Sequence, residues 1–151
     1  MDDLADAYAD RGVSSAFIYT REAHPGENYR HHSSMDDKRA NAEAFVEHSK
    51  VRRPILLDTL DGAAHLAYGL LPNMTWILGR GGVVHYKGAW TAASVIASAL
   101  EATLTGLELR SGGGVVPMYE ERLSWRESDP DAFRAGLERA GPQAVSDFYG
   151  S

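Results

Sequence analysis

Residues 73–88, NMTWILGRGGVVHYKG, constrain the fold more than any other part of the chain. Two runs rich in β-branched and aromatic residues flank the tetrapeptide Gly-Arg-Gly-Gly at residues 79–82. Glycine reverses the chain at little steric cost, so the two runs are predicted to pair as an antiparallel hairpin. The fold must therefore include a sheet with an antiparallel edge.

Helix and strand patterns alternate along the rest of the chain. Ser34, Thr91 and Asp129 each stand where a helix N-cap is favoured. Helices are predicted over residues 1–11, 33–50, 61–68, 91–104 and 128–141, and strands over residues 13–20, 53–59 and 115–119. This order is typical of a mixed α/β protein.

Composition narrows the class of protein. A chain of 151 residues is long enough to bury the core of one domain. The formal net charge of −6 argues against a general nucleic-acid binder. No apolar run approaches the roughly 18 residues needed to cross a bilayer, and the acidic N-terminus has no signal-peptide pattern. We therefore expect a cytoplasmic protein that binds neither nucleic acid nor membranes.

The sequence contains no cysteine. This excludes disulfides, thiolate nucleophiles and sulfur-ligated metals within the chain. Any chemistry must use other side chains, and residues 18–32 concentrate two carboxylates, three of the six histidines and two arginines in one predicted loop.

Several strings, taken in order, resemble the iodothyronine deiodinase branch of the thioredoxin-fold proteins. FIYTREAHPGE (residues 17–27) is similar to the strand and Glu-Ala-His loop of that family, and ILLDTLDGAAHLAYGLLP (55–72) to its next strand and turn. WILGRGGVVHYKG (76–88) is similar to the family hairpin, and Trp90 stands near a common family tryptophan. The resemblance covers about residues 4–104. It implies a thioredoxin-like three-layer sandwich whose mixed sheet ends in a β-hairpin and a helix.

The chain departs from that family at its N-terminus. It starts inside the family's first helix, so the first strand and the loop with the redox selenocysteine or cysteine have no counterpart. The missing strand is central in the thioredoxin sheet. Insertion of the tail strand, a strand from a second chain, a rearranged sheet and a longer gene product all stay open as explanations.

We expect a homodimer, because an open central edge exposes unpaired backbone groups. Residues 1–106 are predicted to form the thioredoxin-like domain. Residues 107–151 are predicted to form an extension that packs on this domain or at the dimer interface.

The candidate catalytic residues lie in the segment 18–32. The resemblance implies that Glu22 and His24 form the Glu-Ala-His motif, which lines the family's substrate pocket, and that His31 or His32 is a further family histidine. In this hypothesis Glu22 orients His24, His24 acts as base or acid, and His31 or His32 is the complementary group.

Four further residues are candidates for substrate binding. Tyr19 and Trp90 could line a pocket for a flat apolar ligand. Asp58 ends a predicted strand, although it could also cap the following helix. Pro72 matches the family's cis-proline, which faces the active site.

These observations predict a cofactor-independent acid/base enzyme. It would catalyse a cyclisation, isomerisation or elimination on a small phenolic or polyketide-like metabolite. The alternative is a non-catalytic subunit with a degenerate thioredoxin fold that binds a small molecule or a partner. A merely solvated loop also stays open, as does a weak metal site at Glu22, His24 and His31 or His32. The spacing matches no fixed zinc motif, so we predict no metal.

Overall fold

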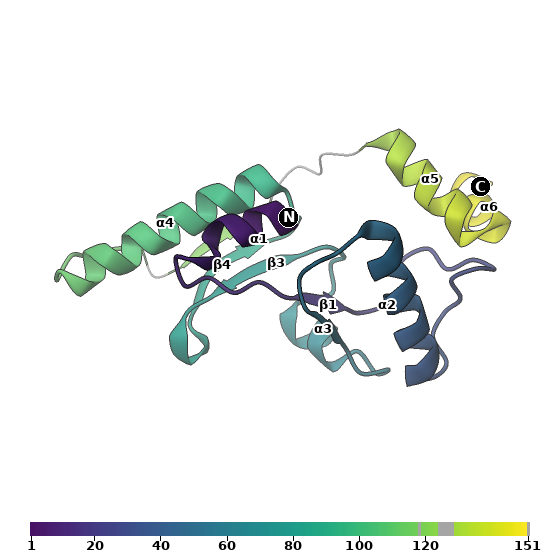
Figure 1. The fold of residues 1–151 in the computed structure, drawn as a ribbon, viewed down its shortest axis with the longest axis horizontal. Helices are drawn as coiled ribbons and strands as arrows, with labels where there is room; N and C mark the ends of the chain where they lie inside the picture. Colours follow the sequence, from purple (N-terminus) through teal and green to yellow (C-terminus); the bar gives the residue numbers. More distant parts are fainter. Residues whose placement is uncertain (118, 124–128, 151) are drawn as a thin grey trace. The chain divides into compact units, whose positions relative to one another are not determined.

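The computed structural model describes residues 1–117, 119–123 and 129–150. The chain is mixed α/β, as predicted (Figure 1). Its elements are α1 (Asp2–Ala9), β1 (Phe17–Tyr19), α2 (Met35–Ser49), β2 (Ile55–Leu57), α3 (Ala63–Tyr68), β3 (Thr75–Leu78), the 3₁₀ turn η1 (Arg80–Gly82), β4 (Val84–Gly88), α4 (Ala93–Ser111), β5 (Glu120–Arg122), α5 (Pro130–Ala140) and α6 (Pro142–Tyr149).

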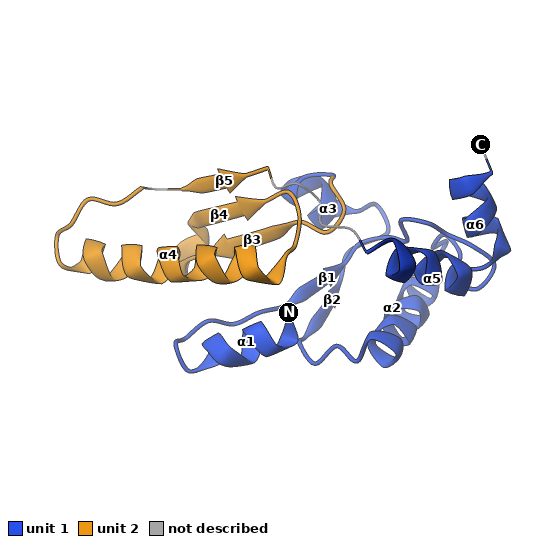
Figure 2. Cartoon of the chain, turned by 90° about the horizontal axis from the view of Figure 1, so that it is seen from above, with its two compact units in different colours: residues 1–70, 128–151 blue, residues 71–127 orange. Residues whose placement is uncertain are grey.

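The chain forms two compact units (Figure 2). Unit 1 contains residues 1–70 and 128–151, and unit 2 contains residues 71–127. The predicted domain boundary after residue 106 falls inside α4, which runs on to Ser111. None of the described helices is long and apolar enough to cross a membrane.

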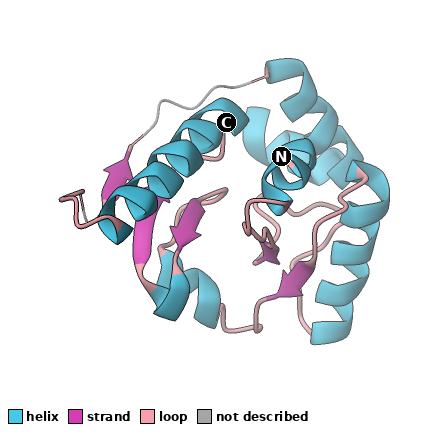
Figure 3. Ribbon diagram, turned by 60° about the vertical axis from the view of Figure 1, so that its left-hand side comes forward, coloured by secondary structure: helices cyan, strands magenta, loops and turns pink. Residues whose placement is uncertain are grey.

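Unit 1 is built on a parallel pair of short strands, which Figure 3 shows among its helices. Phe17 in β1 lies opposite Ile55 in β2, and the chain between the two strands forms α2. The predicted cap of α2 is confirmed, because the Ser34 hydroxyl accepts a hydrogen bond from the Asp37 N–H at 3.1 Å. This is the strand–helix–strand order expected for parallel pairing.

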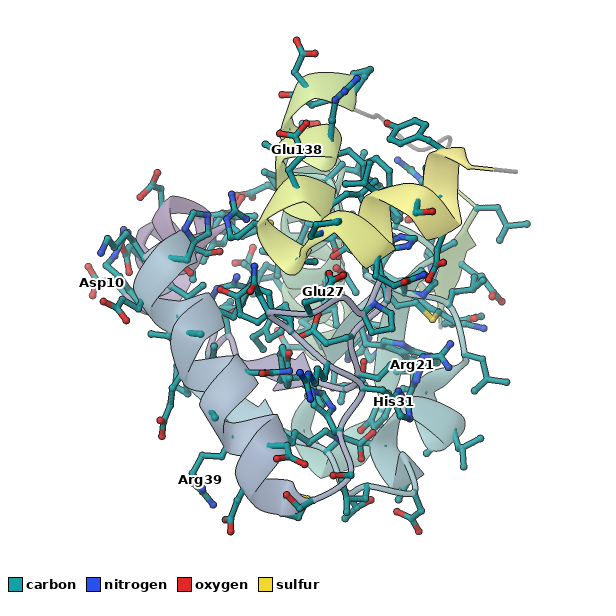
Figure 4. All side chains as sticks on the ribbon, turned by 90° about the vertical axis from the view of Figure 1, so that its right-hand side faces the viewer. Asp10, Arg21, Glu27, His31, Arg39 and Glu138 are labelled. Atoms are coloured by element: carbon teal, nitrogen blue, oxygen red, sulfur yellow. The ribbon has the colours of Figure 1, made fainter. Side chains whose placement is uncertain are left out.

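The C-terminal helices of unit 1 dock on the loop that follows β1. The predicted cap of α5 is confirmed, since Asp129 accepts from the N–H groups of Asp131 and Ala132. The carboxylate of Glu27 accepts from the Gln143 N–H, 3.1 Å away, in the first turn of α6. Figure 4 shows Glu27 beside these two helices. Their buried contact consists of Leu137, Ala140 and Ala144, with Tyr29 and Val145 packed against it.

Unit 2 contains the predicted hairpin and the long helix α4. β3 and β4 pair antiparallel, with Ile77 opposite Tyr86, and the turn between them uses positive φ angles at Gly81 and Gly82. The face of α4 with Ile96 and Leu100 is buried. The third strand, β5, pairs in parallel with β4.

Two expectations for this region are wrong, and one open alternative is not observed. The predicted strand over residues 115–119 is absent where described; β5 starts at Glu120, and Met118 lies outside the described residues. Insertion of the tail strand beside β1, one of the open explanations, is not observed among the described residues, where β1 pairs with β2 and β5 with β4. Thr91 does not cap α4, since its hydroxyl instead bonds the Thr75 hydroxyl (2.6 Å) and the Asn73 carbonyl (2.8 Å). These long-range bonds replace the local cap.

Candidate small-molecule site

A cavity of about 330 Å³ lies within unit 1, bounded by α2, α5 and the loop after β1. This volume is in the usual range of small-molecule pockets. The lining residues are Glu22, Ala23, His24, Tyr29, Asn41, Phe45, His48, Ser49, Ala132, Phe133, Gly136, Leu137, Arg139 and Ala140.

Helical periodicity explains how the two helices form opposite walls. Residues 41, 45 and 48 of α2 follow an i, i+4, i+7 spacing, and so do residues 132, 136 and 139 of α5. Side chains at this spacing share one face of a helix. Each helix therefore presents a single stripe of side chains to the cavity, and the loop supplies the rest.

Glu22 is the acidic group of the cavity. Its side chain is half-buried, and the Tyr19 hydroxyl donates a hydrogen bond to its Oε1 atom. Burial raises the pKa of the Glu22 carboxyl above its ordinary value. A carboxylate with a raised pKa holds a proton more strongly, which makes it a better general base near neutral pH. Tyr19 itself is buried and lies behind Glu22, with its ring 6.2 Å from that of Phe45.

His24 also lines the cavity, so the structure brings two predicted site residues together. Its ring meets Phe133 of α5 and Phe148 of α6 edge-on, with both centroid distances 5.4 Å. Within the described part of the chain no hydrogen bond joins Glu22 to His24. Glu22 therefore does not orient His24 as predicted; its partner is Tyr19.

His31 and His32 do not line the cavity. His31 is exposed, whereas His32 packs against the ring of Tyr19 at a centroid distance of 5.6 Å. The Nε2 atom of His32 is buried and has no hydrogen-bond partner among the described residues. Burial and the nearby charges of Lys38 and His31 lower the pKa of His32. The second imidazole that lines the cavity is that of His48, on α2.

Asp58 stabilises the turn between β2 and α3. Its buried carboxylate accepts from the N–H groups of Thr59, Ala64 and His65 at 2.8 to 3.0 Å. Burial acts to raise the pKa of Asp58, but these bonds outweigh it and hold the pKa below its usual value. The structure places Asp58 outside the cavity lining and in the capping role that sequence reasoning considered second.

Lys38 is a buried residue that the sequence analysis missed. Its ammonium group, on α2, donates to the carbonyl oxygens of Asp58 and Thr59, both at 2.9 Å. The side chain is only 2% exposed, and burial lowers its pKa despite the opposing charges of Asp58 and Asp61. Lys38 is four residues before the buried Ala42, so helical spacing was the available signal.

Pro72 and Trp90 belong to unit 2, whereas the cavity is formed by unit 1. Pro72 is exposed and Trp90 is half-buried. The cis-proline expectation is wrong, because no peptide bond in the described residues is cis.

The predicted residues do not assemble a metal site. Nowhere in the described ranges do three or more His, Asp or Glu side chains gather so that they could hold an ion. Comparison of the chain with family models, curated proteins and solved structures finds no match.

Proposed function

We propose that the cavity of unit 1 is the active site of a cofactor-independent enzyme that transfers protons on a small aromatic metabolite. One observation carries this proposal: a half-buried carboxyl with a raised pKa, Glu22, lines the same aromatic-walled cavity as two imidazoles, His24 and His48. Perturbed titratable groups that converge on a cavity are typical of acid/base sites.

In the proposed mechanism Glu22 is the general base. Because the Tyr19 hydroxyl donates a hydrogen bond to Oε1 of Glu22, the Oε2 atom accepts the proton from a carbon or hydroxyl group of the substrate. His24 or His48 then donates a proton to the negative charge that develops elsewhere on the substrate. A positioned base of this kind contributes about 10²- to 10⁴-fold in rate. Cyclisation, isomerisation and elimination of phenolic or polyketide-like compounds all need these two proton transfers.

The proposal includes a thioredoxin-like arrangement that lacks its first strand. It is supported by the parallel order β1–α2–β2 and by the β3–β4 hairpin that precedes α4. It is also supported by the unpaired edges, because among the described residues β1 pairs only with β2 and β3 only with β4. The thioredoxin fold would fill these edges with its first strand.

A generic probe tests the proposed base before the natural substrate is known. When a base removes the C3 proton of 5-nitrobenzisoxazole, the N–O bond breaks, the C–N bond becomes a nitrile and a coloured phenolate is released. No other reactant is needed. We expect the protein to accelerate this ring opening, and Glu22→Gln to lower the acceleration about 100-fold. The matched control is Glu43→Gln, an exposed carboxylate of α2 outside the cavity lining. Equal rates for the two variants, or no acceleration by the wild type, would overturn the proposal.

A second candidate is a binding protein without catalysis. The edge-on packing of His24 between Phe133 and Phe148 favours it, because this aromatic cluster gives the imidazole a structural role beside the cavity. This candidate predicts that aromatic ligands bind the wild type and Glu22→Gln equally, and that neither protein turns over the probe.

A further inference from the structure

We propose that the cavity binds a planar ligand of about two fused rings that carries a negative charge, with Arg139 contacting the charge. This inference rests on the proposed use of the cavity as a small-molecule site and specifies the ligand. It depends on three features of the lining: the guanidinium group of Arg139, the gap at Gly136 and the aromatic walls.

Arg139 is the group of the lining that can bind an anion. Arg139 lines the cavity together with one carboxyl group, that of Glu22, and two imidazoles. The Arg139 guanidinium has no hydrogen bond or ion pair to another described residue, although its backbone carbonyl accepts from Asn28. Arg134, on the same helix, pairs with Glu138 at 3.0 Å. Arg139 is therefore a cation that a ligand carboxylate or phenolate can bind in two-point fashion.

Gly136 leaves room for the ring system. A methyl group built on Gly136 would meet no atom within 4 Å, although this residue lines the cavity. Glycine is among the least favourable residues inside a helix, and nothing in the backbone requires it here, because Gly136 has an ordinary helical φ. We infer that its missing side chain keeps the space beside Phe45 and Phe133 open.

The volume sets the size of the ligand. A protein cavity of about 150 Å³ accepts one benzene ring. The cavity volume of about 330 Å³ is roughly twice that, which fits two fused rings between the aromatic side chains of Tyr29, Phe45 and Phe133.

The test compares a charged ligand with its neutral isostere. Calorimetric titration with 2-naphthoate and 2-naphthamide should show naphthoate binding at least tenfold more tightly to the wild type. Arg139→Gln should remove this preference and leave naphthamide binding unchanged, while the control Arg134→Gln keeps the preference. Gly136→Leu should abolish binding of both compounds, with a Tm no lower than that of the wild type because leucine favours helix. If Gly136→Leu unfolds the protein, Gly136→Ala should still weaken both compounds.

Other outcomes overturn the inference. Equal affinity for the two compounds, or no binding of either, would mean that Arg139 serves only as a cation at the C-terminal end of α5. The ring-opening assay with Glu22→Gln distinguishes failure of this inference from failure of the proposed function. If the wild type does not prefer naphthoate but opens the ring of the probe in a way that depends on Glu22, only the proposed ligand class is rejected. A naphthoate preference without Glu22-dependent ring opening rejects only the catalysis.

Discussion

At the scale of single residues, the charge that Glu22 needs as the proposed base lowers the stability of the fold. Burial raises the pKa of this carboxyl in the folded state, so the folded protein binds the proton more tightly than the unfolded chain. The protonated carboxyl stabilises the fold by its full amount at pH values below the ordinary carboxyl pKa. This stabilisation is lost as the pH rises through the pKa of the folded state. At neutral pH the charged carboxylate therefore costs stability.

We expect Glu22→Gln to raise the free energy of unfolding at pH 7 by about 0.5 kcal/mol, since solvent screens part of the effect. The amide oxygen of glutamine still accepts from Tyr19, so the packing of the loop is kept. Urea titrations at pH 7 and at pH 4 measure the free energy of unfolding of both proteins. The difference between them should vanish at pH 4, where the wild-type carboxyl is protonated. A variant that is less stable than the wild type at pH 7 would show that the charge stabilises the fold.

At the scale of helices and strands, two local helix caps were predicted correctly, whereas long-range contacts were not predicted. The caps Ser34 and Asp129 could be predicted because each bonds N–H groups within three residues. The role of Glu27 could not, because it caps a helix whose Gln143 is 116 residues away in sequence. The same distinction holds for the residues of the site. Glu22 and His24 could be predicted because they lie in one motif, whereas Arg139 reaches the cavity only through the docking of α5.

That docking yields a prediction about Glu27. Its carboxylate accepts from the Gln143 N–H at the start of α6, where the helix dipole favours negative charge. Glu27→Ala should lower the free energy of unfolding by about 1 kcal/mol in urea titrations. The control is Glu43→Ala, which removes an exposed carboxylate of α2. Equal stability of the two variants would mean that the buried contact of Leu137, Ala140 and Ala144 holds the helices without the cap.

At the scale of the whole molecule, the open edge of β1 leads to a prediction about assembly. The Phe17 N–H donates to the Pro54 carbonyl (2.9 Å), and the Tyr19 carbonyl accepts from the Asp58 N–H (3.1 Å). Both residues therefore face β2. Because alternate residues of a strand in a parallel pair direct their backbone groups to opposite edges, the N–H and C=O of Ile18 face the edge that no described strand covers. Such an edge is a template for another chain.

We predict that this edge pairs with its symmetry mate in a homodimer, since one two-fold axis satisfies both copies at once. Ile18→Pro removes the N–H donor from the open edge and leaves the bonds to β2, because proline is tolerated at such an edge. Light scattering at micromolar concentration should give a dimer for the wild type and for Ile18→Val, and a folded monomer near 16.5 kDa for Ile18→Pro. Circular dichroism verifies that each variant is folded. A monomeric wild type would reject the dimer, and a dimeric, folded Ile18→Pro would place the interface elsewhere than at β1.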